Sequence, residues 1–436
     1  MIENKRLGVA LSGGGYRAAG FHIGTMKKLH EHGLLDKVDV LSTISGGSIV
    51  GAAYCLHQGS FEEFEKEMVE TLSTKSVVRF VLTSWRFLIT AIPLLMLILA
   101  TFILPFTSFA IYTLVPLCIL IFTIIKYQFR LLPLSKIIEK AYDAYFFKGA
   151  VLSDLCTIPE IAINSTNLQT VRHFTFSARK MEDTAYAYYN PPIYYKHADF
   201  PVSRAVMAST CVPFAFTPVS IDRQYYSNPD LYDTVNPKLI DGGIYDNQGI
   251  HKLMQKNSSY SCHVVIVSDA GTILPFEQAY NNTFTLLLRT VEGFMARIKN
   301  FQMMHSIFSQ HHGREVAYLS LGWDIEQCVE GFYRNLLSDN IPSATLNAHE
   351  LLQVWIEKPK ECREEILKYI KERVQIERIK SEYISEQELH NIRSIGTNLT
   401  PIKKKLLQDM VKHSSVMTEL QIRLYCPTII AWLGKQ

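Results

Sequence analysis

The chain has 436 residues, of which 48% are hydrophobic and 19% are charged, and its formal net charge at pH 7 is +3. This composition is typical of a globular protein that buries a sizeable core, and it excludes a disordered, a collagen-like and a disulfide-scaffold protein. So weak a net charge gives no indication of a nucleic-acid partner.

Two strand–turn–helix units open the chain. Their strands and helices are predicted, in order, at residues 7–11, 19–32, 38–44 and 48–57. Each strand is a short apolar run, and the turns that follow the strands, at residues 13–15 and 45–47, are rich in glycine. Repetition of this unit predicts a parallel α/β sheet. An acidic amphipathic helix is predicted next, over residues 61–70.

An apolar block then interrupts the α/β pattern. Residues 87–125 carry no charged side chain, and this stretch is about twice the ~20 residues that one helix needs to cross a bilayer. Pro105 lies near its middle, where a turn is expected. We therefore predict a membrane hairpin with one helix over residues 87–104 and a second over residues 108–125.

Basic residues flank both ends of the hairpin, namely Lys75, Arg79, Arg86, Lys126 and Arg130. Because basic flanks stay on the cytoplasmic side, we expect a protein that is integral to the membrane through residues 87–125, with the α/β domain in the cytoplasm. A full crossing and a re-entrant hairpin both fit the pattern. An apolar hairpin inside the core of a soluble protein is the alternative, although neither half shows the polar face that a soluble helix keeps.

The α/β pattern resumes after the hairpin. Helices are predicted at residues 136–147 and 202–209, and strands at residues 159–164, 171–178, 185–188 and 263–268. From about residue 276 the pattern is helical and more charged, with an amphipathic helix over residues 356–380. The fold expected is a three-layer α/β sandwich with a mainly parallel sheet. Its expected parts are an α/β domain over residues 1–75 and 136–275, an inserted membrane hairpin over residues 76–135, and a helical C-terminal region over residues 276–436.

Ser45 is the candidate nucleophile, because it lies where the second predicted strand turns into a helix. Such a turn exposes the serine hydroxyl at the carboxyl end of the sheet, and it needs small residues two positions to either side. Gly47 supplies the downstream position, and Gly46 keeps the turn slim. Thr43 stands where the usual pattern has glycine, so the match is partial.

Two other serines compete with Ser45 for this role. Ser12 also ends a predicted strand before a run of glycines. Ser48 has Gly46 upstream, but Val50 fills the downstream position, so Ser48 fits the pattern less well.

A loop of three consecutive glycines, Gly13, Gly14 and Gly15, follows the first strand. It lacks the G-K-[S/T] ending of a Walker loop and the G-x-G-x-x-G spacing of a dinucleotide site. Consecutive glycines expose several backbone amides in one concavity, which is what an oxyanion hole requires. We expect Arg17 either to fix this loop or to hold a lipid phosphate.

An acidic candidate lies much later in the chain. Asp241 opens an Asp-Gly-Gly turn directly after the apolar pair Leu239-Ile240. An aspartate on a glycine turn can reach across a site to a serine. Asp241 is therefore the expected partner of the nucleophile.

In this order, the glycine loop, the serine turn and the aspartate turn resemble the patatin-like phospholipase family. Two further segments are similar to family motifs: residues 164–168 with 174–177 resemble its N-x-T-[D/N] strand pair, and residues 204–213 with 217–219 resemble its R-A-S-x-A-x-P…P-V segment. The likeness covers residues 6–75 and 150–272.

The resemblance implies a Ser-Asp dyad in which Ser45 is the nucleophile and Asp241 takes its proton, with an acyl-enzyme that water then hydrolyses. It implies that Gly13, Gly14 and Gly15 form the oxyanion hole. It implies supporting roles for Arg17, Gly46, Gly47 and Asn247. A Ser-Asp-His triad is the alternative mechanism, since His251 and His263 both follow Asp241 in the chain.

The function expected is hydrolysis of acyl esters of membrane lipids, of the phospholipase A or lysophospholipase type, by an enzyme that the hairpin holds at the bilayer. The expected partners are a phospholipid or other acyl-ester lipid and the bilayer itself. The eight cysteines are scattered singly, so we expect free thiols and no metal, and the dyad chemistry needs no cofactor. Two alternatives stay open: an acyltransferase that uses the same dyad, and a catalytically silent lipid-binding or scaffold protein.

Overall fold

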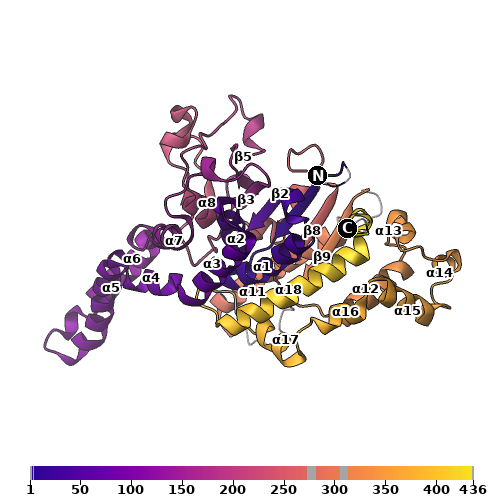
Figure 1. The fold of residues 1–436 in the computed structure, drawn as a ribbon. Coiled ribbons are helices and arrows are strands. Elements are labelled where there is room, and N and C mark those ends of the chain that lie inside the picture. Colours follow the sequence, from indigo (N-terminus) through magenta and orange to yellow (C-terminus); the bar gives the residue numbers. More distant parts are fainter. Residues whose placement is uncertain (1, 3, 273–280, 305–312, 435–436) are drawn as a thin grey trace.

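The computed structural model describes residue 2 and residues 4–272, 281–304 and 313–434 (Figure 1). Its centre is a nine-stranded sheet in which the main path runs β5-β4-β3-β2-β1-β8-β9, while β7 pairs with β3 and β6 with β7. The strands are β1 (Leu7–Leu11), β2 (Val38–Ile44), β3 (Glu160–Asn167), β4 (Arg172–Phe176), β5 (Met181–Asp183), β6 (Val219–Ser220), β7 (Lys238–Asp241), β8 (Val264–Asp269) and β9 (Glu315–Ser320).

The middle of the sheet is parallel and one side of it is antiparallel. Strand β1 pairs in parallel with β2 and β8, β2 with β3, and β8 with β9. Strands β4 and β7 both run antiparallel to β3. All five residues of β1 and all six of β8 are buried, as expected for parallel strands that are covered on both faces. The predicted α/β fold with a mostly parallel sheet is confirmed.

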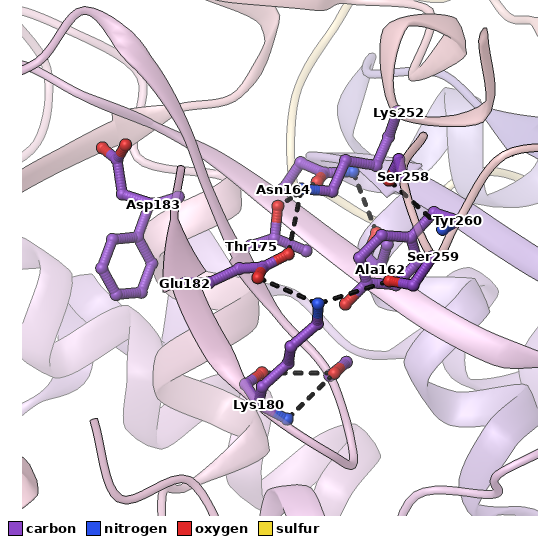
Figure 2. Close-up of polar contacts among 12 residues, drawn as sticks. Ala162, Asn164, Thr175, Lys180, Glu182, Asp183, Lys252, Ser258, Ser259 and Tyr260 are labelled. Carbon is purple, nitrogen blue, oxygen red and sulfur yellow. Dashed lines mark hydrogen bonds and ion pairs between the residues drawn. The ribbon is translucent and has the colours of Figure 1, made fainter. Parts of the chain in front are cut away.

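Helices cover both faces of the sheet. The larger core packs against α1 (Gly15–Glu31), α2 (Gly46–Leu56) and the long C-terminal helix α18 (Lys404–Tyr425). The smaller core lies on the other face, beneath α10 (Ile250–Met254). The buried Lys252 of α10 forms an ion pair with Glu182 of β5 at 3.4 Å, which attaches this helix to the antiparallel side (Figure 2).

The other α-helices are α3 (Phe61–Thr74), α4 (Val77–Thr83), α5 (Trp85–Ile103), α6 (Leu114–Leu131), α7 (Leu134–Tyr142), α8 (Val202–Ser209), α9 (Gly243–Asp246), α11 (Thr283–Gln302), α12 (Ile325–Leu337), α13 (Ser343–Ala348), α14 (Gln353–Glu357), α15 (Arg363–Arg373), α16 (Ile376–Ser381), α17 (Glu386–Arg393) and α19 (Pro427–Leu433). Helix α18 lies along α1, and the hydroxyls of Thr25 and Ser414 are hydrogen-bonded across this contact at 2.9 Å. The end of the chain is therefore part of the packing around the sheet.

The structure corrects three predicted elements. Residues 185–188 are not a strand: β5 ends at Asp183, whose carboxylate accepts a hydrogen bond from the Ala185 amide and closes a turn, and a 3₁₀ helix follows. The stretch 356–380 is not one helix, because Gln375 adopts a left-handed φ of 60° between α15 and α16. The C-terminal region, predicted as helical, also contributes β9 to the sheet, where its six residues are buried beside β8.

The apolar block forms a helical hairpin of α5 and α6, which Figure 1 shows projecting from the body as a two-helix arm. The helical stretch Trp85–Phe106 has a mean hydropathy of 2.7, and none of its most apolar part is buried inside the protein. The second stretch, Ala110–Phe147, has a mean hydropathy of 2.0. Both are long and apolar enough to cross a membrane by length and composition, and insertion into a bilayer stays a prediction.

Candidate active site

Ser45 lies at the carboxyl end of β2, on the sharp turn into α2. Its φ of 49° and ψ of −116° are a backbone conformation that L-residues rarely adopt, as expected for a nucleophile elbow. Close packing of the next residue holds the turn: a Cβ on Gly46 would lie 2.1 Å from the Gly15 carbonyl oxygen. Glycine at position 46 thus lets α2 begin directly against the glycine loop.

A buried hydrogen-bond network supports the elbow. The Ser45 amide donates to Oγ of Ser209 at 2.9 Å, and that hydroxyl donates to the Asn164 carbonyl oxygen at 2.6 Å. The Asn164 side chain is itself fixed, since it accepts from Thr175 and donates to the Ala162 carbonyl (Figure 2). Sequence reasoning assigned no role to Ser209. Ser209 lies in the segment that resembles the family's R-A-S-x-A-x-P motif, and this resemblance could have marked it as a candidate. Nothing in that segment, however, indicates which loop Ser209 contacts.

The threonine at position 43 is accommodated by a glycine nearby, Gly51. A Cβ on Gly51 would lie 2.7 Å from Cγ2 of Thr43, so the absent side chain at position 51 leaves room for the threonine. Oγ of Ser48 donates to Oγ1 of Thr43 at 3.0 Å. Thr43 therefore replaces the expected glycine and also binds the start of α2.

The competing serines are engaged elsewhere. Ser48 is fully buried and its hydroxyl lies in the network with Thr43 and Ser209. Ser12 is also fully buried, and its Oγ accepts a hydrogen bond from the Ala270 amide at 2.9 Å. Neither hydroxyl contacts Asp241 within the residues that the structure describes.

Asp241 ends β7, and the pairing of β7 with β3 places it beside Ser165. Oγ of Ser45 donates to Oδ2 of Asp241 at 2.9 Å, and the Gly243 amide donates to Oδ1 at 2.7 Å. Burial raises the pKa of Asp241 to about 6, although the hydrogen bonds from Gly243 and Ser45 lower it in part. The carboxylate is thus oriented at both oxygens and ionised near neutral pH.

The histidines of the alternative triad lie elsewhere. The ring of His251 packs against those of His173 and Tyr245, with centroids 5.8 and 5.2 Å away. Nδ1 of His263 accepts a hydrogen bond from the Arg6 amide at 3.2 Å. Over residues 4–272, 281–304 and 313–434, no histidine is hydrogen-bonded to Ser45 or to Asp241.

The glycine loop lies beside the elbow, but its three amides are not equivalent. The Gly13 amide donates to the Asn247 carbonyl oxygen at 3.0 Å, so the prediction that it forms part of an oxyanion hole needs correction. Within the described part of the chain, no acceptor is hydrogen-bonded to the backbone amides of Gly14 and Gly15. A Cβ on Gly46 would lie 2.8 Å from the Gly15 nitrogen, which places this amide next to the residue that follows Ser45.

Two of the residues predicted to support this loop lie beside it. Asn247 lies between the glycine loop and the aspartate loop, with its Oδ1 2.4 Å from the position of a Gly13 Cβ and 2.6 Å from that of a Gly243 Cβ. Arg17 is largely buried in α1, and its guanidinium donates to the Ile395 carbonyl oxygen at 2.8 Å. Both expected roles of Arg17, fixing the loop and holding a lipid phosphate, stay predictions. Among the described residues, no group of three histidine, cysteine, aspartate or glutamate side chains is arranged to hold a metal.

The sequence matches the patatin-like phospholipase family over residues 9–254. This is more than half of the chain, and it contains both Ser45 and Asp241. The chain belongs to the patatin-like phospholipase family. The predicted membership is confirmed, and it supports lipid acyl hydrolase activity in general.

Other comparisons add little to this assignment. The crystal structure of VipD from Legionella pneumophila is 15% identical to this patatin-like protein, with a TM-score of 0.32, over 98% of this chain and 91% of that one. A likeness this distant carries no argument about the site. No curated protein matches the sequence.

Proposed function

We propose that this patatin-like protein hydrolyses acyl esters of membrane phospholipids or lysophospholipids through a Ser45–Asp241 dyad. The observation that carries the proposal is the 2.9 Å hydrogen bond from Oγ of Ser45 to Oδ2 of Asp241, made by a serine on a strained turn. A silent scaffold protein would have no need to keep this strain, which typically costs about 1–3 kcal/mol. The intact site therefore favours an enzyme.

Apart from the substrate and the water that hydrolyses the acyl-enzyme, the chemistry needs only side chains and backbone amides of this chain. Ionised Asp241 takes the hydroxyl proton of Ser45 while Oγ attacks the ester carbonyl carbon, and the amides of Gly14 and Gly15 stabilise the oxyanion. The C–O bond to the glycerol oxygen then breaks, and Asp241 returns the proton to the leaving alcohol. Water, deprotonated by Asp241, attacks the acyl-enzyme, and the fatty acid leaves as Ser45 regains its proton.

The hairpin of α5 and α6 supports a membrane lipid as the substrate. Its helices are apolar and project from the body, so a bilayer is the environment in which their surface is stable (Figure 1). Anchoring there keeps the dyad at the surface where acyl esters are concentrated. The basic residues at both ends of the hairpin support a cytoplasmic α/β domain.

The test is release of fatty acid from mixed phospholipid vesicles by the full chain. The wild type is compared with Ser45→Ala and Asp241→Asn, and with the matched controls Ser73→Ala, at a half-buried serine of α3, and Asp230→Asn, at an exposed aspartate. We expect both dyad variants to lose release and both controls to keep it. Covalent labelling by a fluorophosphonate probe should be lost in Ser45→Ala and kept in Ser73→Ala.

Two results would contradict the proposal. Full release by a clean preparation of Ser45→Ala would exclude Ser45 as the nucleophile. Absence of both release and labelling in the wild type would favour the lipid-binding scaffold. Addition of an alcohol acceptor such as glycerol, followed by product analysis, separates hydrolysis from acyl transfer.

A further inference from the structure

Helix α11 lies directly over the acidic side of the dyad. Cε of Met295 is 3.1 Å from the position of a Cβ on Gly243, the residue whose amide holds Asp241. Helix α11 also packs against α9, the short helix that begins at Gly243. Through these two contacts, the inner face of α11 is attached to the loop that carries the catalytic aspartate.

An ion pair joins the same face of α11 to the sheet. Nζ of Lys299 donates to Oδ2 of the fully buried Asp269, at the end of β8, at 2.5 Å. Tyr318 of β9 donates to the same oxygen at 2.6 Å. These contacts fix the orientation of α11 around its axis, and the side chains on its other sides are directed outward.

One of these outward sides is apolar and exposed within the part of the chain that the structure describes. Of the side chains of α11 that the structure describes, none is buried, although the helix is 20 residues long. Leu287, Phe294 and Phe301 are 43%, 62% and 61% exposed and lie seven residues apart, so they follow each other along one side of the helix. We call these three side chains the α11 ridge.

The residues around the ridge have the pattern of an interfacial helix. Leu286 and Met304 extend the apolar surface at its two ends, and both are more than half exposed. Arg297, which is exposed, lies between Phe294 and Phe301 on the same side. Large apolar side chains combined with arginine are typical of helices that lie in the plane of a lipid surface, where the guanidinium reaches phosphate groups.

We propose that α11 docks on the surface of the lipid bilayer through this ridge. The inference rests on the proposed function for its substrate class, because a face beside the dyad must meet the ester-bearing surface. The α5–α6 hairpin makes this docking effectively intramolecular: once the arm is inserted, the body stays close to the lipid. Docking then brings the Asp241 loop to the interface, so an acyl ester reaches Ser45 without crossing water.

The direct test is depth-dependent quenching of tryptophan fluorescence in the full chain, reconstituted in phosphatidylcholine–phosphatidylglycerol vesicles with brominated acyl chains. Phe294→Trp places the probe on the ridge. Val354→Trp is the matched control, since Val354 is 48% exposed on α14, which Figure 1 shows at the opposite end of the body from the hairpin. We expect quenching above the wild-type signal for Phe294→Trp and none for the control. Equal quenching of the two variants overturns the proposal.

A second measurement separates docking from catalysis. In the triple variant Leu287→Ser/Phe294→Ser/Phe301→Ser, the ratio of vesicle hydrolysis to hydrolysis of a monomeric soluble ester should fall at least about tenfold, because three apolar side chains no longer enter the lipid. The variant Leu352→Ser/Val354→Ser should keep the ratio, as both of its residues are exposed on the distant end.

The outcomes of the two measurements can be told apart. Quenching of Phe294→Trp without hydrolysis of any ester would refute the proposed function and keep the docking. Hydrolysis without ridge quenching would refute the docking and keep the function. A wild-type dimer that the triple variant dissociates, with no quenching in vesicles, would assign the ridge to a second copy of the chain and also overturn the proposal.

Discussion

Replacing Asp241 by asparagine should stabilise the fold while it removes catalysis. The carboxylate is buried at the end of β7, and its burial raises the pKa to about 6 from an ordinary value of 3.8. The folded protein therefore binds more protons than the unfolded chain between about pH 4 and pH 6, and stability falls as the pH rises through this window. Above about pH 6, the full penalty of the buried charge is present.

The size of the expected change in stability follows from the shift in the pKa of Asp241. A difference of about two pKa units corresponds to about 3 kcal/mol at 1.4 kcal/mol per unit, and this figure already includes the hydrogen bonds from Gly243 and Ser45. Asparagine carries no charge and keeps one oxygen that can accept from the Gly243 amide. We expect Asp241→Asn to be about 1–3 kcal/mol more stable than the wild type at about pH 8, with the difference vanishing below about pH 4.

The assay is thermal or denaturant unfolding of both proteins in the same detergent, repeated from about pH 4 to pH 8. Asp230→Asn, at an exposed aspartate, is the control and should follow the wild type at every pH. The reasoning would be refuted by a stability difference that stays constant across this range. A variant less stable than the wild type at high pH would also refute it, because the hydrogen bonds would then outweigh the buried charge.

Three further predictions concern catalysis and the elbow. The rate kcat/KM should rise with pH through about 6, because Asp241 must be ionised to take the serine proton; a profile flat from pH 5 to 8 would exclude it as the base. Ser209→Ala should leave the Ser45 amide without its acceptor, lowering kcat by about 10-fold or more with little change in KM and costing about 1–3 kcal/mol of stability. Ser209→Thr, which keeps the hydroxyl, should recover part of kcat, and failure to do so would remove the positioning role. Gly46→Ala should lower the Tm by several degrees or abolish folding, since its Cβ would lie 2.1 Å from the Gly15 carbonyl oxygen; an unchanged Tm would show that the loop can move away.

Part of the fold was predictable because it depends on local patterns in the sequence. The strands at residues 7–11 and 38–44 were predicted at the bounds that the structure shows, since each is a short apolar run that ends at a glycine turn. Strand β9 was missed, because it is a short segment within a region whose sequence pattern is otherwise helical, and all six of its residues are buried. Its pairing with β8 is a long-range contact that no local window contains.

The candidate site shows the same division. Ser45, Asp241 and the glycine loop stand out in the sequence because each combines a reactive or flexible residue with a sharp turn after a strand. The contact from the Gly13 amide to the Asn247 carbonyl, which removes one predicted oxyanion donor, depends on how two distant loops pack. The role of Ser209 has the same origin, since it acts through a backbone amide 164 positions away in the chain.

The sequence by itself determined the class of fold, the family, the candidate residues of the proposed dyad and the apolar hairpin, because periodicity, glycine turns and uncharged length are local properties of a chain. Only the tertiary structure decided which amides stay free beside Ser45, how buried Asp241 is, and that α11 lies over it with an apolar outer face. These properties depend on desolvation and on contacts between segments far apart in the chain. Such contacts form only when the sheet brings its strand ends together.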